Sequence, residues 1–128
     1  MVVPRLLITD DDHALRRAIA DVFRQLGLEI STAGDGDEAI NLIDGGNIHL
    51  VVVDVHMPRV SGLEVIRHAQ SFNRKLPCIL MSAALDESIE REAEQMHAYR
   101  VLSKPLRVST LRETVMQGLR EVYGWNVG

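Results

Sequence analysis

Acidic side chains, one hydroxyl and one ammonium group follow short apolar runs at four places in this chain of 128 residues. These residues are Asp10, Asp11, Asp12, Asp54, Ser82 and Lys104. If the fold brings them together, two carboxylates about 4 Å apart repel by about 4 kcal/mol at an effective dielectric constant near 20. Such a cluster needs a cation, and a hard divalent ion such as Mg²⁺ suits oxygen ligands.

Carboxylates, Mg²⁺, a lysine and a hydroxyl are together the parts of a phosphoryl-transfer site. A carboxylate can also be the nucleophile, which gives an aspartyl phosphate. Lys104 is one of two lysines among 14 basic residues, and its compact ammonium can pair with a carboxylate or a phosphate. Taken singly, the residues have plainer explanations. The acids at 10–12 would stabilise a helix N-terminus, and Ser82 would be an ordinary hydroxyl at a strand end.

Composition limits the kind of protein. A chain of this length is expected to form one domain, covering residues 1–128. The net charge of −4 argues against nucleic acid as a direct partner. The lone Cys78 excludes an internal disulfide and a multi-cysteine metal site. No apolar run approaches the ~20 residues of a membrane span, and no signal-peptide pattern is present, so the expected location is the cytoplasm.

Short apolar runs alternate with amphipathic segments along the chain. Strands are predicted at residues 5–9, 28–33, 49–54, 78–82 and 100–102, and an amphipathic helix follows each one, the last at 108–122. Alternating strands and helices predict a parallel sheet with helices on both faces. Ligands of such sheets lie beyond the carboxyl ends of the strands, where all of the polar residues above are placed.

From end to end, the chain resembles the receiver domain of bacterial two-component response regulators. The matching segments are 6–12 (LLITDDD), 51–58 (VVVDVHMP) with Gly62, 79–83 (ILMSA) and 102–106 (LSKPL). Each segment alone is weak evidence, but all four occur in the order of the family. The resemblance implies a flavodoxin-like (βα)5 sandwich of three layers, with a five-stranded parallel sheet of strand order 2-1-3-4-5.

The resemblance also implies a magnesium site. Asp10 and Asp11 would be the acidic pair, with Asp11 the more direct ligand and Asp10 acting largely through water. Asp54 would be a further ligand. His56 would contribute its backbone carbonyl and not its imidazole, and the five histidines as a group are interpreted as surface or loop residues without the spacing of metal ligands.

Further roles concern the phosphoryl group. Asp54 would be the phosphoacceptor, Ser82 would bind a phosphoryl oxygen, and Lys104 would pair with Asp54 or its phosphoryl group. The Lys104–Pro105 peptide bond is expected to be cis. By the same resemblance, the chain is a signalling domain that assists its own phosphorylation and dephosphorylation, and not an enzyme acting on a separate substrate.

Partners follow from the resemblance too. A phosphohistidine on a sensor histidine kinase or phosphotransfer protein would be the donor, and an output domain or effector would read the result. Homodimerisation is expected through the surface formed by the helix after Asp86, the strand at 100–102 and the last helix. The helix after Asp86 has a thin apolar stripe, so this helix is expected to move when the loop after Ser82 closes. Residues 123–128 lose periodicity and are expected to fray.

Two positions depart from the family pattern. The usual aromatic three residues before the lysine is replaced by Val101. Strand alternation places Tyr99 on the same face as Val101, which makes Tyr99 a candidate substitute for the aromatic. His97 stands where glycine is common, seven residues before the lysine.

Three other functions fit the sequence less well. A haloacid-dehalogenase-like phosphatase also uses an aspartate nucleophile, but Asp54-Val55-His56 lacks the second aspartate of its motif. A flavodoxin-like cofactor binder would need a phosphate loop after the first strand, where three aspartates would repel the phosphate. A receiver that binds partners without phosphorylation is disfavoured by the complete set of acceptor residues.

Overall fold

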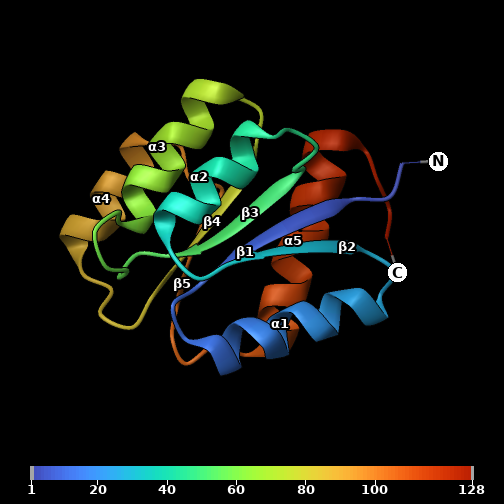
Figure 1. The fold of residues 1–128 in the computed structure, drawn as a ribbon, viewed down its shortest axis with the longest axis horizontal. Helices are drawn as coiled ribbons and strands as arrows, with labels where there is room; N and C mark the ends of the chain where they lie inside the picture. Colours follow the sequence, from blue (N-terminus) through green and yellow to red (C-terminus); the bar gives the residue numbers. More distant parts are fainter. Residues whose placement is uncertain (1, 128) are drawn as a thin grey trace.

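In the computed structural model, which describes residues 2–127, five strands alternate with five helices (Figure 1). The strands are β1 (Arg5–Thr9), β2 (Glu29–Ala33), β3 (Leu50–Asp54), β4 (Cys78–Ser82) and β5 (Arg100–Ser103). The helices are α1 (His13–Gln25), α2 (Gly36–Asp44), α3 (Gly62–Phe72), α4 (Glu87–Gln95) and α5 (Val108–Tyr123). The predicted elements are therefore confirmed, with shifts of one residue at some strand and helix ends.

The five strands form one parallel sheet of order β2-β1-β3-β4-β5, as predicted. All five residues of β3 are buried, because this central strand is covered on both faces. Its run of four apolar residues before Asp54 suits that position. The outer strand β5 is the least buried one and has exposed residues at both ends.

Helices cover both faces of the sheet, which gives three layers. Figure 1 shows α1 and α5 on one face and α2, α3 and α4 on the other. Alternate residues of β3 divide between the two cores: Val51 and Val53 pack on the side of α2 and α3, whereas Leu50 and Val52 pack on the side of α1 and α5. The alternation of side chains along each strand thus assembles two hydrophobic layers around one sheet.

Four of the five helices begin with a side-chain cap. Each cap oxygen accepts a hydrogen bond from a backbone N–H three residues later, and such a cap stabilises a helix by about 1 kcal/mol. The caps are Asp12 for α1, Asp35 for α2, Ser61 for α3 and Asp86 for α4. Because α1, α2, α3 and α4 begin at the carboxyl edge of the sheet, these caps also fix the loops around the polar cluster.

Tyr99 does not lie on the face of Val101, so this expectation is wrong. Tyr99 packs in the core of α1 and α5, whereas Val101 packs in the core of α2 and α3. The reason is that β5 begins at Arg100, so strand alternation does not extend back to Tyr99. Its hydroxyl donates to Glu121, and its ring lies 3.4 Å from where a Cβ of Gly118 would be. Gly118 therefore makes room in α5 for the Tyr99 ring.

The segment after α5 packs against the amino-terminal edge of the sheet. Gly124 ends the helix in the left-handed conformation with φ of +75°. The rings of Tyr123 and Trp125 stack at a centroid distance of 4.4 Å, and the Tyr123 hydroxyl donates to the His49 carbonyl at 2.7 Å. Fraying of residues 123–128 concerns motion and stays a prediction, and Gly128 lies outside the described residues.

Across residues 2–127, no helix combines the length and the apolar character that crossing a bilayer requires.

Candidate functional site

The register of the sheet brings the polar residues to one edge. Thr9 of β1 is aligned with Val53 of β3. Asp10 comes directly after Thr9 and Asp54 directly after Val53, so the two aspartates lie at neighbouring strand ends. On the other side, Asp54 is aligned with Met81, and Ser82 with Ser103. Three strand ends and the residue after β5 therefore meet at the carboxyl edge, as the sequence predicts.

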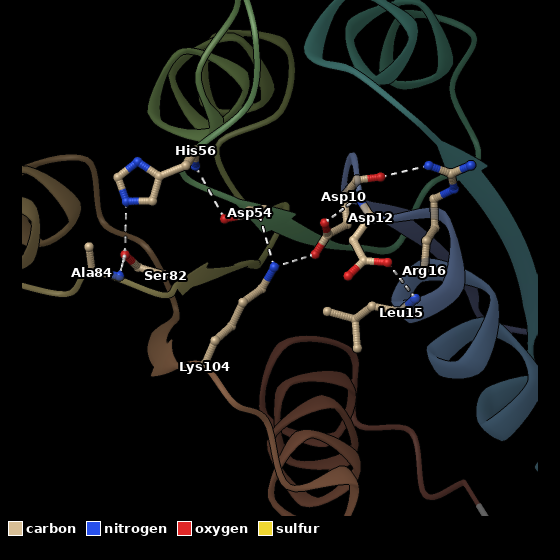
Figure 2. Close-up of polar contacts among 9 residues, drawn as sticks. All are labelled: Asp10, Asp12, Leu15, Arg16, Asp54, His56, Ser82, Ala84 and Lys104. Atoms are coloured by element: carbon tan, nitrogen blue, oxygen red, sulfur yellow. Dashed lines mark hydrogen bonds and ion pairs between the residues drawn. The ribbon is translucent and has the colours of Figure 1, made fainter.

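Lys104 connects the two buried carboxylates. Its Nζ donates to Asp10 Oδ2 at 2.7 Å and to Asp54 Oδ2 at 2.9 Å (Figure 2). The lysine side chain is 15% exposed, and those of Asp10 and Asp54 are 0% and 7% exposed. Burial alone would lower the pKa of Lys104, but the hydrogen bonds and charges of the two aspartates outweigh it and raise this pKa. The ammonium therefore stays charged where it neutralises part of the acidic cluster.

A third carboxylate belongs to the same cluster. Oxygen atoms of Asp10, Asp11 and Asp54 all lie within 4.8 Å of one another. Asp11 is exposed, whereas both oxygens of Asp10 already accept hydrogen bonds, Oδ1 from the Asp12 N–H at 2.9 Å and Oδ2 from Lys104. Three oxygen donors of this kind fit a hard divalent cation. The donor set leaves Asp11 the freest of the three to bind one.

Asp12 has a different role from its two neighbours. Its side chain accepts a hydrogen bond from the Leu15 N–H at 3.1 Å and so caps α1. This is the function that the sequence favours for Asp12 by itself.

Ser82 is buried at the end of β4 and makes two contacts through its hydroxyl. Oγ accepts a hydrogen bond from the Ala84 N–H at 3.1 Å and lies 3.2 Å from His56 Nε2 (Figure 2). The second contact joins the loop after β3 to the end of β4. Sequence reasoning placed His56 correctly in an exposed loop, but it did not anticipate this contact, because histidine spacing carries no signal for it.

Two further backbone features shape the site. The Lys104–Pro105 peptide bond is cis, as expected. Gly62, the first residue of α3, lies directly against the chain at Asp54: a Cβ there would be 2.2 Å from the Asp54 carbonyl oxygen. Only glycine permits this approach, so the glycine of the matching sequence segment has a steric reason.

No sequence pattern indicates the role of Arg16 in α1. Its guanidinium donates to the backbone carbonyl of Asp10 at 2.7 Å. This contact fixes the main chain between β1 and α1 (Figure 2). Its position on the helix, one turn after the N-cap, makes that contact possible.

Comparison with known proteins agrees with the fold. Residues 6–116 match the family described as "Response regulator receiver domain". The chain is 30% identical over 118 residues to response regulator RR06 of Streptococcus pneumoniae, covering 92% of this chain and 54% of that protein. It is 28% identical over 114 residues to the probable chemotaxis protein CheY of Rhizobium etli, covering 87% of this chain and 88% of that protein.

A solved structure is similar as well. It is the response regulator protein TrrA from Thermotoga maritima in complex with Mg²⁺-BeF, with a TM-score of 0.83 and 29% sequence identity. The alignment covers 91% of this chain and 100% of that one. The fold, the acidic edge and these matches define one class of protein. The chain belongs to the family of response regulator receiver domains.

Proposed function

We propose that the chain accepts a phosphoryl group on Asp54 in a Mg²⁺-dependent reaction and thereby changes its affinity for a signalling partner. The observation that carries the proposal is the position of Lys104, whose ammonium donates to both Asp10 and Asp54 within the buried part of the acidic cluster. A buried carboxylate with a cationic partner and two acidic neighbours suits a nucleophile for phosphorus better than it suits a structural role.

The ligands proposed for Mg²⁺ are the side chains of Asp10, Asp11 and Asp54 and the backbone carbonyl of His56. The three clustered carboxylates support the assignment, with Asp11 as the direct ligand and Asp10 acting largely through water. When bound, Mg²⁺ would supply positive charge that offsets the negative charge of the entering phosphoryl group.

In the proposed transfer, a carboxylate oxygen of Asp54 attacks the phosphorus of a phosphohistidine. A P–O bond forms while the P–N bond breaks, and its electron pair returns to the imidazole, which takes up one proton. Lys104 remains protonated and pairs with the new phosphoryl group. The Ser82 hydroxyl donates a hydrogen bond to a phosphoryl oxygen and keeps its proton. These roles require no proton transfer from Lys104, which agrees with its raised pKa.

The proposed phosphodonor is a sensor histidine kinase or a phosphotransfer protein, and the proposed reader is an output domain or effector. The chain spans about half the length of RR06, so the activity of any longer protein that contains it is part of the proposal. A homodimer through α4, β5 and α5 is the proposed assembly. The location proposed for such a signalling domain is the cytoplasm, and no separate substrate is proposed for it.

The phosphatase alternative has less support. Family membership over residues 6–116 favours a receiver domain, and Asp54 is followed by Val55 and His56 where that enzyme class needs a second aspartate.

Intact-protein mass spectrometry after incubation with acetyl phosphate and Mg²⁺ tests the proposal. The wild type should gain the mass of one phosphoryl group, and Asp54→Asn should gain none while it keeps its fold by circular dichroism. Replacing Asp86, an acidic helix cap outside the cluster, with Asn is the matched control and should leave the uptake unchanged. Uptake by Asp54→Asn at the wild-type rate would assign the acceptor to another residue.

A further inference from the structure

The hydroxyl of Ser82 is held by two nitrogen atoms of the protein. A serine hydroxyl has one proton to donate and two lone pairs that accept. The Ala84 N–H donates to one lone pair at 3.1 Å, and His56 Nε2 lies 3.2 Å from the same oxygen. Ser82 itself is 0% exposed, so its hydroxyl has little access to water. The partner of its proton is therefore decided by the ring of His56.

Two arrangements satisfy the His56–Ser82 contact. Either Ser82 donates its proton to an unprotonated Nε2, or Nε2–H donates to the second lone pair of Oγ. The carboxylates of Asp10, Asp11 and Asp54 gather at the same edge of the sheet, and their negative charge attracts the hydroxyl proton. This field favours the second arrangement, in which the Ser82 proton remains free for the acidic side of the site.

We propose that His56 is a positioning residue that acts through Ser82: its Nε2–H and the Ala84 N–H fill both lone pairs of Oγ and thereby reserve the hydroxyl proton for a phosphoryl oxygen on Asp54. The hydroxyl becomes a dedicated donor before the phosphoryl group arrives. Figure 2 shows the ring of His56 reaching from the loop after β3 toward Ser82 and Ala84. This inference rests on the proposed function and adds a side chain to the phosphoryl pocket.

The geometry makes His56 separable from the metal site. The imidazole contacts Ser82, whereas the contribution proposed for Mg²⁺ is the backbone carbonyl of His56, which a substitution of the side chain retains. The backbone N–H of His56 also stays, and it donates to Asp54 Oδ1 at 3.2 Å. A substitution of the His56 ring should therefore weaken binding of a phosphoryl group, but it should not change the binding of Mg²⁺ in the absence of that group.

The test compares His56→Leu, which removes the donor, with His56→Gln, whose amide nitrogen can reach the same position and donate. Beryllium fluoride in saturating Mg²⁺ is the phosphoryl mimic, and its dissociation constant is measured by calorimetry. The loss of one hydrogen bond should weaken its binding about two- to tenfold in His56→Leu. His56→Gln should bind within about twofold of the wild type. His68→Leu, which removes a ring bonded to Asp44 on α2, is the matched control.

A double-mutant cycle distinguishes action through Ser82 from a general effect of the loop. In a Ser82→Ala background, His56→Leu should cause no further weakening. An equal weakening with and without Ser82, wild-type binding by His56→Leu, or binding by His56→Gln as weak as that of His56→Leu would each overturn the inference while the proposed function stands. A wild type that binds no beryllium fluoride and takes up no phosphoryl group would overturn both.

Discussion

Lys104 and Asp54 are 50 positions apart in the sequence, and their side chains meet at 2.9 Å between Nζ and Oδ2. The bond joins the segment after β5 to the end of β3, across the intervening strand β4. It exists only when the register of three strands is correct. The charge pattern of the site is thus a direct product of the sheet topology.

Removal of the ammonium should destabilise the fold. In Lys104→Met, Asp10 and Asp54 remain buried without their shared cation. The free energy of unfolding should fall by about 1–3 kcal/mol, less than for a fully buried pair because Lys104 is itself 15% exposed. Urea unfolding measures the change. Lys75→Met is the control, because Lys75 is the other lysine, is exposed and makes no ion pair among residues 2–127. Equal losses in both variants would contradict the role given to Lys104.

The difference in unfolding free energy between the wild type and Lys104→Met should depend on pH in one direction only. The pKa of Lys104 is raised above its usual value of 10.5, so its contribution is complete below that value and is lost as the pH rises through the folded-state pKa. The stability gap between wild type and Lys104→Met should therefore be constant near neutrality and narrow in alkaline solution.

Mg²⁺ should stabilise the wild type against unfolding. At 100 times its dissociation constant, a ligand that binds only the folded state adds about 2.7 kcal/mol. Asp11→Asn should abolish this gain, because Asp11 is the exposed member of the carboxylate cluster. Thermal unfolding with and without Mg²⁺ measures the effect. Asp12→Asn is the matched control, since asparagine is also a good N-cap for α1 and the metal response should persist. If both variants lose it equally, general negative charge and not Asp11 binds the ion.

Helix α4 should respond to the phosphoryl mimic. Ala93 is its only buried residue, so few contacts resist its movement. Closure of the loop after Ser82 toward Asp54 should therefore change hydrogen exchange between residues 83 and 102 when beryllium fluoride and Mg²⁺ are added. Segment 13–25, which is α1, is the internal reference and should change little. Changes confined to the neighbourhood of Asp54 would contradict this account of the switch.

His49 should make the free energy of unfolding depend on pH in the mildly acidic range. Desolvation lowers its pKa below 6.5, the charge of Arg5 lowers it further, and Glu29 opposes the shift. The unfolded chain therefore binds a proton more readily, and stability should rise with pH from the folded-state pKa up to about 6.5. Its Nδ1 accepts the Arg5 N–H at 2.9 Å, which asparagine can imitate. The His49→Asn variant should show a smaller rise than the wild type in urea unfolding at several pH values. Identical profiles would exclude the contribution of His49.

The strands, the helices and the polar edge could be predicted because they follow from local patterns. An apolar run ending in Asp54, capping residues before helices, and Lys104 followed by proline each carry a signal within a few positions of sequence. The family resemblance then supplied the order in which the strands pair. Roles within the cluster, such as metal ligand or phosphoacceptor, are chemical and await the measurements above.

Contacts between distant side chains could not be predicted in the same way. The approach of His56 to Ser82 depends on the path of the loop after β3. The hydrogen bond from Arg16 to the Asp10 carbonyl depends on the side-chain conformation of Arg16. The error at Tyr99 has a related cause, because strand alternation was extended past the point where β5 begins. Pattern arguments hold inside regular elements and fail at their ends.

Gly62 gives the site a mechanical property. Its Cα lies so close to Asp54 that an added Cβ would be 2.2 Å from the Asp54 carbonyl oxygen, and its N–H donates to the Val55 carbonyl at 3.0 Å. Main chain thus rests on main chain, with no side chain between them to absorb a displacement. A movement of the Asp54 peptide must therefore be shared by the first turn of α3, so this helix is directly coupled to the proposed acceptor. Helix α4, by contrast, has few buried contacts that restrain it.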